Sequence, residues 1–271
     1  MKVSEANILV HSKMADTYNE REPHFRPENR AQVRRVLESL RAYTGGKLLD
    51  LGCGTGFIID LADGLFDEIH GVDITEAMIA KIDTSREHIF THICNAENLP
   101  FADASFDVVT SYAFLHHLQD YRPVFKEVFR VLRKGGIFYV DLEPNAHFWK
   151  LASSYDNAAK EAYSDIVKKE IDSVCHTDDQ VLKEFGISKE VFNAAEHIKS
   201  IAGGIDGEIL KADALYTGFA SCDIQYQWYA GQGKVLHEQS ASAADLVDRY
   251  LREMLPLSQS LYKYIRFVIT K

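Results

Sequence analysis

Short apolar runs alternate with longer segments of helical period along most of this chain. Seven runs have the length and apolar content of buried strands. Because helical segments separate most of them, we expect a parallel sheet with helices on both faces, which is an α/β fold. The predicted strands are residues 48–51, 68–74, the first part of 90–101, 105–114, 135–144, 221–229 and 262–270.

The helical segments show apolar residues at i, i+3, i+4 and i+7. Residues 29–40 follow this rule, and Pro27 suits the first turn of such a helix. Residues 121–132 follow it too, and we expect Gly135 and Gly136 to end that helix. Further helices are expected across about 4–43, in 148–174, from 177 onwards, in 209–215 and in about 242–254.

The predicted strand at 221–229 carries a group of aromatic residues. Strand alternation predicts Tyr226 and Trp228 on one face and Tyr229 on the other. We expect most of this group to pack within the sheet, with one ring bordering a binding pocket.

Three alternate glycines follow the first predicted strand and precede an apolar helix. Without Cβ atoms, Gly52, Gly54 and Gly56 allow positive φ and let a ligand lie directly on the backbone. Their spacing differs from the G-x-G-x-x-G pattern that binds a pyrophosphate. Asp50 precedes them, and a carboxylate there suits a ligand with an ammonium group. The turn therefore predicts a nucleoside-binding crevice.

The next two strands end in side chains that suit the same ligand. Asp73 ends the second strand, where a carboxylate can accept both hydroxyls of a ribose. Asn95 follows the third strand, where its amide could meet a purine edge. A helix-capping role for Asp73 and a turn role for Asn95 are the structural alternatives.

Composition and charge limit the function classes. The chain has 271 residues, 46% of them hydrophobic, which permits one large domain or a core with an insertion. No apolar run reaches about 18 residues, so no membrane span is expected. Residues 1–7 lack a signal-peptide pattern, which predicts a cytoplasmic protein.

The net charge of -10 argues against a nucleic-acid partner. Arg34, Arg35 and Arg41 are expected on a solvated helix face.

The thiols and the acidic residues around one histidine do not predict a metal. Cys53, Cys94, Cys175 and Cys222 are scattered without C-x-x-C spacing, which favours reduced thiols over a disulfide frame or a zinc site. His176 has acidic neighbours, but four ligands on one short turn cannot all face one ion, so a helix cap is the preferred interpretation.

Four motifs in order give the chain a family resemblance, which covers about residues 14–144 and weakens beyond Glu143. It resembles the class I S-adenosylmethionine-dependent methyltransferases, and most of all their ubiquinone/menaquinone-biosynthesis-like branch. The motifs are D-L-G-C-G-T-G, G-V-D-I-T, N-A-E-N-L-P-F-A-D-A-S-F-D-V-V and E-V-F-R-V-L-R-K-G-G.

The resemblance implies a Rossmann-like, doubly wound, seven-stranded, mostly parallel sheet with helices on both faces. The chain departs from the family after the fifth strand, and we expect the inserted residues to fold over the carboxyl edge of the sheet as a helical lid. We expect residues 1–144 and 206–271 to form the cofactor-binding core, with a further insertion at about 230–261. Residues 145–205 would be the helical insertion or lid.

The resemblance also assigns site residues. Asp50 and the glycines would hold the methionine part of S-adenosylmethionine, Asp73 the ribose, and Ile74 an adenine face. Tyr18 would cover the site, although ordinary packing could also explain that ring. The full set implied for the cofactor is Tyr18, Asp50, Gly52, Cys53, Gly54, Gly56, Asp73, Ile74, Asn95, Ala96 and Ser111.

The implied reaction is a direct displacement at the sulfonium methyl group, which leaves S-adenosylhomocysteine. The acceptor would be a small molecule that offers oxygen or nitrogen rather than carbon. Candidates for a base are His116, His117, Tyr112 and His147, each with a structural role as the alternative. A structural hydrogen bond is the specific alternative for His117.

Two other functions remain open at this point. A protein that binds the cofactor or a partner without catalysis would have the same motifs. A nicotinamide-dependent oxidoreductase is disfavoured by the glycine spacing. Neither the acceptor nor the oligomeric state follows from the sequence.

Overall fold

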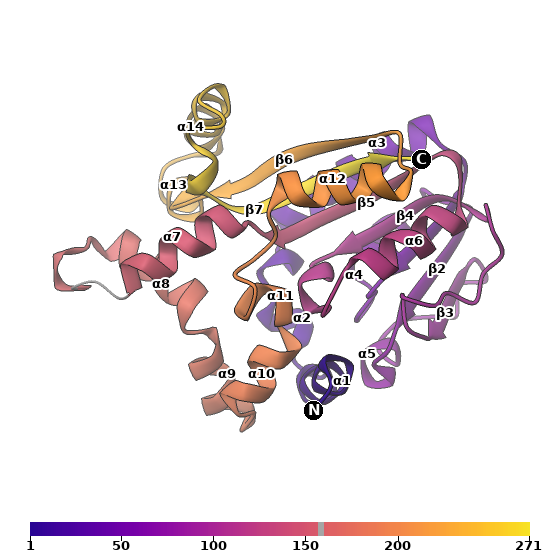
Figure 1. Ribbon diagram of the computed structural model, residues 1–271, viewed down its shortest axis with the longest axis horizontal. Coiled ribbons are helices and arrows are strands. Elements are labelled where there is room, and N and C mark those ends of the chain that lie inside the picture. Colours follow the sequence, from indigo (N-terminus) through magenta and orange to yellow (C-terminus); the bar gives the residue numbers. More distant parts are fainter. Residues whose placement is uncertain (157–159) are drawn as a thin grey trace.

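A seven-stranded sheet forms the centre of the molecule (Figure 1). The computed structural model describes residues 1–156 and 160–271. The strands lie in the order β3-β2-β1-β4-β5-β7-β6. They are β1 Lys47–Leu51, β2 Glu68–Asp73, β3 Ile89–Ile93, β4 Phe106–Tyr112, β5 Leu132–Pro144, β6 Ser221–Tyr229 and β7 Tyr262–Thr270.

The sheet is parallel except around β7. Strands β1 to β5 pair in parallel, with Asp50 opposite Gly71 on one side and Thr110 on the other. Strand β7 runs antiparallel to both β5 and β6. The predicted fold, a doubly wound, mostly parallel, seven-stranded α/β sheet, is confirmed. Because parallel strands end at one edge, the residues after β1, β2, β3 and β4 meet there.

Helices cover both faces of the sheet, and each face has its own core. Alternation along β1 turns Leu49 and Leu51 to one core and Leu48 to the other. Helices α6 (Arg122–Val131) and α12 (Gly207–Thr217) pack on the first face, and α3 (Pro27–Tyr43) and α4 (Phe57–Ala62) on the second. In Figure 1, α6 and α12 lie in front of the sheet and α3 behind it. Pro27 is the first residue of α3, as predicted.

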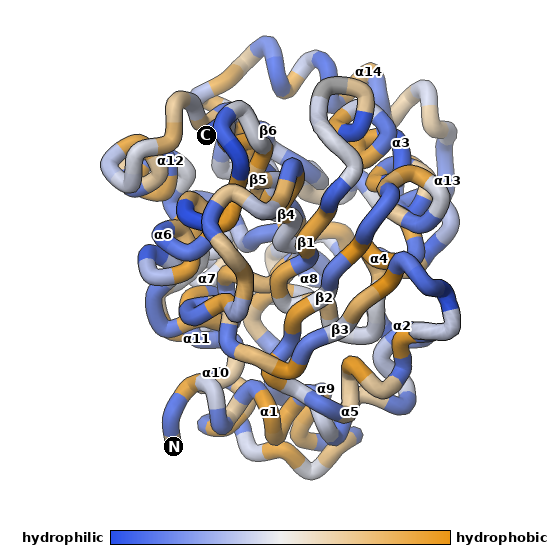
Figure 2. The backbone as a smooth tube through the Cα atoms, turned by 90° about the vertical axis from the view of Figure 1, so that its right-hand side faces the viewer, coloured by the Kyte–Doolittle hydropathy of each residue, from blue (hydrophilic) through white to orange (hydrophobic). Residues whose placement is uncertain are grey.

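The remaining helices lie at the ends of the sheet and outside it. Helix α1 packs against α10, and in Figure 2 both lie with α9 at one end of the molecule. The segments are α1 Val3–Met14, α2 Tyr18–Arg21, η1 Pro23–Phe25, α5 Glu76–Ile79, η2 Leu115–His117, α7 Ala146–Asp156, η3 Lys160–Ala162, α8 Asp165–Cys175, α9 Thr177–Phe185, α10 Lys189–Ala195, α11 His197–Ser200, α13 Gln232–Glu238, α14 Ala241–Glu253 and η4 Gln259–Leu261.

Two predicted helix boundaries are wrong. Helix α6 ends at Val131, before the glycines, because Leu132 is extended and pairs with Phe106 as the start of β5. Gly135 and Gly136 therefore lie within β5, where Gly135 has φ +76°. The single helix expected over 148–174 is interrupted, since α7 and α8 are separate helices.

The aromatic group of β6 does not alternate as predicted. Trp228 has φ +59°, which breaks the regular pleat. As a result Tyr226 and Tyr229 both enter the same core cluster, and Trp228 points elsewhere. Within residues 1–156 and 160–271, none of the helices combines the length and the apolar character that crossing a membrane requires.

Candidate functional site

The glycine turn after β1 has the backbone conformation that the sequence predicts. Gly52, Gly54 and Gly56 have φ of +62°, +51° and +93°. A Cβ added to Gly52 would lie 2.2 Å from the ring of Phe114, so any larger residue there would clash as well as strain the backbone. The turn is closed by the N–H of Gly56, which donates to the carbonyl of Cys53 at 2.8 Å.

A cavity of about 370 Å³ lies against this turn. It collects most of the predicted cofactor residues from the ends of β1, β2 and β3 and from α2. The predicted residues that line it are Tyr18, Asp50, Gly52, Cys53, Gly54, Asp73, Ile74, Asn95 and Ala96. Gly56 does not line the cavity, but its positive φ is part of the turn. Ser111 is fully buried in β4, its Oγ has no hydrogen-bond partner within the described chain, and it does not line the cavity.

The carboxylate of Asp73 links two strand ends. Its Oδ2 accepts the N–H of Gly54 at 3.0 Å, and its Oδ1 accepts the N–H of Thr75 at 2.8 Å. Thr75 is the N-cap residue of α5, but its side chain makes no capping bond. Asp73 therefore organises the local backbone and also lines the cavity.

Asp50 lies at the bottom of the same cavity and is only 2% exposed. Burial raises the pKa of Asp50 to about 8, although the hydroxyl of Thr110, which donates to it at 2.8 Å, opposes the rise. Asp73 adds to the increase. A cationic group placed beside Asp50 would favour its charged form.

A second cavity, of about 760 Å³, adjoins the first. The two share one wall, which we call the shared wall and which consists of His11, Tyr18, His24, Tyr112, Ala113 and His117. Burial lowers the pKa of His24 to about 3 and raises the pKa of both tyrosines, so these three groups are neutral at pH 7. The rings of His24 and Tyr112 pack edge to face, 5.4 Å apart.

The helical segment 145–205 between β5 and β6, called the insertion below, and the C-terminal strands supply another side of the second cavity. Helix α8 contributes Lys169 and Glu170, and β7 contributes Lys263 and Tyr264. Lys263 forms an ion pair with Glu170 at 2.7 Å. Trp228, turned out of the core by its positive φ, also lines this cavity. The second cavity is therefore polar and charged, in contrast to the shared wall.

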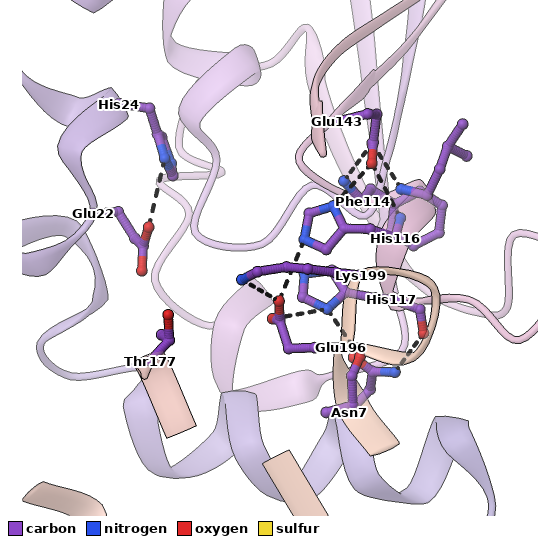
Figure 3. A network of polar contacts seen from close by, with 12 residues as sticks. Asn7, Glu22, His24, Phe114, His116, His117, Glu143, Thr177, Glu196 and Lys199 are labelled. Carbon is purple, nitrogen blue, oxygen red and sulfur yellow. Dashed lines mark hydrogen bonds and ion pairs between the residues drawn. The ribbon is translucent and has the colours of Figure 1, made fainter. Parts of the chain in front are cut away.

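A polar network connects the end of β5 to the insertion (Figure 3). Glu143 is fully buried and accepts the N–H groups of Phe114, Leu115 and His116 at 2.8 to 3.1 Å. It also accepts the ring Nδ1 of His116 at 2.8 Å. Glu196, at the end of α10, contacts His116 and His117 and pairs with Lys199 at 2.6 Å.

The electrostatics of this network keep Glu196 charged. Burial alone would raise the pKa of Glu196, but Lys199 and the two imidazoles outweigh it and hold the pKa below its ordinary value. Burial lowers the pKa of His117, although Glu196 opposes the decrease. Burial also raises the pKa of Glu22, another carboxylate that lines the second cavity, and Glu196 adds to the increase.

The predicted catalytic residues separate into three positions. Tyr112 and His117 lie on the shared wall, and His116 lines the second cavity. His147 lines neither cavity and lies 4.0 Å from Asp206. The structure also adds His24 and Glu196, which were not predicted from the sequence. Both lie outside the four motifs, and no local pattern marked either one.

Known proteins are similar to the part of the chain that forms most of the first cavity. A family model described as "Methyltransferase domain" matches residues 49–140, which contain the glycine turn, Asp73, Asn95 and most of β5. A demethylmenaquinone methyltransferase of Lactococcus lactis is 38% identical over 110 residues, which is 38% of this chain and 44% of that protein. Residues 49–140 therefore form a methyltransferase domain, and this part of the chain is similar to S-adenosylmethionine-dependent methyltransferases, including demethylmenaquinone methyltransferase.

Other relatives share this methyltransferase domain but not the whole chain. The biotin biosynthesis bifunctional protein BioHC of Teredinibacter turnerae is 32% identical over 153 residues, 47% of this chain and 27% of that protein. The chain thus matches less than half the length of these curated relatives. The resemblance inferred from the four motifs is confirmed for the domain.

Solved structures agree on the fold over nearly the whole chain. A phosphoethanolamine N-methyltransferase 2 of Haemonchus contortus, in complex with phosphomonomethylethanolamine and S-adenosylhomocysteine, aligns with a TM-score of 0.60 at 16% identity, covering 100% of this chain and 60% of that one. An S-adenosylmethionine-dependent methyltransferase of Mesorhizobium loti aligns with a TM-score of 0.56 at 16% identity, covering 93% of this chain and 100% of that one. At this identity the likeness concerns the fold.

Proposed function

We propose that this protein transfers the methyl group of S-adenosylmethionine to a small-molecule acceptor. The cofactor would occupy the cavity against the glycine turn, and the acceptor would occupy the larger cavity beside it. The observation that carries this proposal is the shared wall between the two cavities, because a methyl group leaving the first would enter the second at that place.

The lining of the first cavity suits each part of the cofactor. Asp73 would accept the ribose hydroxyls, while Ile74, Asn95 and Ala96 would surround the adenine. Asp50 would face the ammonium of the methionine part, whose positive charge compensates a buried carboxylate. Tyr18 would cover the site from the side of the acceptor. Ser111 has no part in this proposal because it does not line the cavity.

The shared wall suits a direct displacement. Its neutral aromatic groups would lie near the sulfonium, which ring faces stabilise and cations would repel. Holding the acceptor atom and the methyl carbon in line can supply about 7–11 kcal/mol of the barrier. Water must be kept out of the site during this displacement. We propose that the helical insertion of residues 145–205, together with the segment 230–261, acts as the lid that does so.

The second cavity supports an oxygen or nitrogen acceptor. Its lining holds ammonium, guanidinium, carboxylate and imidazole groups, which bind a hydroxyl- or amine-bearing molecule better than an apolar one. His117 on the shared wall and His116 beside it are the groups we propose for accepting the acceptor's proton. Burial keeps Tyr112 protonated, so its hydroxyl would instead position the acceptor through a hydrogen bond. His147 is not among them, since it lines neither cavity.

The test has two stages. Isothermal titration should detect S-adenosylmethionine and S-adenosylhomocysteine with micromolar affinity, and no comparable binding of a nicotinamide dinucleotide. Incubation with a methyl-labelled donor and a cell extract should then label one small compound. Absence of cofactor binding would refute the proposal. Binding without labelling of any acceptor would reject the enzyme and leave a cofactor-binding protein.

A further inference from the structure

Two histidines and a glutamate converge at the edge of the second cavity. His116 and His117 are adjacent in η2, and Glu196 comes from the end of α10. One ligand atom from each lies within 4.8 Å of the other two, and all three line the second cavity. Two imidazoles and one carboxylate are a donor set that Zn²⁺, Co²⁺ and Fe²⁺ bind in proteins.

The carboxylate of Glu196 lies close to both imidazoles. Nδ1 of His117 lies 3.4 Å from Oε1 of Glu196, and Nε2 of His116 lies 3.8 Å from Oε2. Two ligands that are each about 2.0–2.2 Å from a tetrahedral metal lie roughly 3.3–3.5 Å apart. The separation of Nδ1 of His117 from Oε1 matches this geometry, and the set as a whole, whose atoms lie within 4.8 Å of one another, would contract around the ion.

The ring of His116 is held by a second carboxylate, as in many metal sites. Nδ1 of His116 donates to Glu143, which directs Nε2 toward Glu196. A metal-ligating histidine commonly donates its other nitrogen to a carboxylate in this manner. Glu143 is itself fixed by three backbone N–H groups, so the ring has little freedom.

Two existing contacts must be accommodated. Lys199 pairs with Oε2 of Glu196 at 2.6 Å, so the metal would bind Oε1, the oxygen that faces His117 (Figure 3). Nδ1 of His117 donates to the carbonyl of Ala195 at 3.0 Å, and a metal at this nitrogen would release its proton to solvent.

We propose that His116, His117 and Glu196 bind one divalent transition-metal ion, with a remaining coordination position open to the second cavity. Three protein ligands and one open position are typical of catalytic metal sites. The consequence for the reaction rests on the proposed function: an acceptor hydroxyl bound to this ion would lose its proton to solvent more easily. His116, with one ring nitrogen on the ion and the other on Glu143, would then no longer serve as the base. The sequence predicts no metal, and no local spacing could mark this site because Glu196 is far from the histidines along the chain.

Cobalt titration of the full chain tests the site. After treatment with a chelator and its removal, Co²⁺ should produce visible ligand-field absorption that saturates at one ion per chain, and Zn²⁺ should abolish it. Glu196→Gln and His116→Asn should each weaken Co²⁺ binding at least tenfold. His176→Asn is the matched control, because His176 lies within 4.0 Å of Asp156, Asp172 and Asp179 in the insertion.

Circular dichroism and thermal unfolding verify that each variant is folded. Glu196→Gln keeps the size of the side chain and removes the charge that pairs with Lys199. Absence of Co²⁺ absorption in the unaltered chain would overturn the proposal. So would unchanged binding in folded Glu196→Gln, or loss of binding in His176→Asn. A titration with S-adenosylhomocysteine is read separately: Co²⁺ binding without it supports the metal site while refuting the proposed methyl transfer.

Discussion

Asp73 accepts the backbone N–H of Gly54 at 3.0 Å, which ties the end of β2 to the glycine turn that follows β1. The second carboxylate oxygen accepts the N–H of Thr75. The same carboxylate lines the first cavity, so its position is fixed before any ligand arrives. A prepositioned acceptor loses little conformational entropy on binding.

Asp73→Asn is expected to weaken the binding of S-adenosylhomocysteine by more than tenfold. The substitution keeps the size of the side chain but removes its charge, and hydrogen bonds to charged groups contribute about 1.5–3 kcal/mol each. Isothermal titration measures the change. Asp83→Asn is the control, since Asp83 makes a similar turn contact with the N–H of Ser85 outside the cavity. Equal affinities in Asp73→Asn and the unaltered chain would remove the ribose assignment.

Gly52→Ala is expected to abolish cofactor binding and to lower stability more than Gly64→Ala does. Both glycines have positive φ, so alanine strains the backbone by about 1–2 kcal/mol at either position. Only at Gly52 would the new Cβ also meet Phe114, whereas nothing lies within 4 Å at Gly64. Urea unfolding and titration of the two variants separate strain from clash. Similar losses in both would mean that the Phe114 contact is unimportant.

Cofactor binding at pH 7 is expected to release about one proton from Asp50. With a pKa raised to about 8, Asp50 is mostly protonated in the free protein at pH 7. A neighbouring ammonium would favour the carboxylate and displace the proton. Titration in buffers of different ionisation enthalpy counts released protons, and Asp50→Asn should remove the buffer dependence. Buffer-independent heats in the unaltered chain would contradict the placement of the ammonium.

The raised pKa of Asp50 also makes the free energy of unfolding of the ligand-free protein depend on pH. The folded state binds the proton of Asp50 more tightly than the unfolded state, whose carboxyl has a pKa near 3.8. The stabilising contribution is therefore complete below about pH 4 and is lost as the pH rises toward 8. Asp50→Asn should flatten this part of the profile in urea unfolding. A slope that is unchanged in the variant would assign the effect to another group.

Glu143→Gln is expected to lower the free energy of unfolding by about 2 kcal/mol. The amide of glutamine keeps one oxygen acceptor, but its NH2 group would face the N–H and the ring Nδ1 of His116, which donate to the carboxylate. A buried donor left without an acceptor costs about 1–3 kcal/mol. Urea unfolding measures the loss. Glu87→Gln, at an exposed position, is the control and should change stability little. A loss equal to that of the control would show that the η2 turn does not depend on Glu143.

The sequence predicted the sheet well because its strands carry strong local patterns. The bounds of β6 and β7 match the expected 221–229 and 262–270. Residues 221–229 alternate polar and apolar side chains, and residues 262–270 are mostly apolar. The glycine turn, Asp73 and Asn95 were found because each lies at or just after the end of a strand, and parallel topology brings these ends together. Residues that reach the site from a strand end were therefore predictable.

The rest depended on tertiary contacts that no local pattern encodes. The positive φ of Trp228 reversed the expected face of one aromatic residue. Ser111 occupies an interior position of β4 and does not reach the cavity. His24 and Glu196 reach the second cavity only because the N-terminal helices and the insertion fold against the same edge of the sheet. Their placement follows from packing between distant segments.

The shared wall has a consequence for inhibitor chemistry. Since the two cavities meet at Tyr18, Tyr112 and Ala113, one molecule with an adenosyl group at one end and a polar fragment at the other could fill both at once. Tethering two weak fragments makes the second contact intramolecular, at an effective concentration in the millimolar range for a short linker. A bisubstrate series with varied linkers would thus reveal the span between nucleoside and acceptor, whatever compound the natural acceptor is.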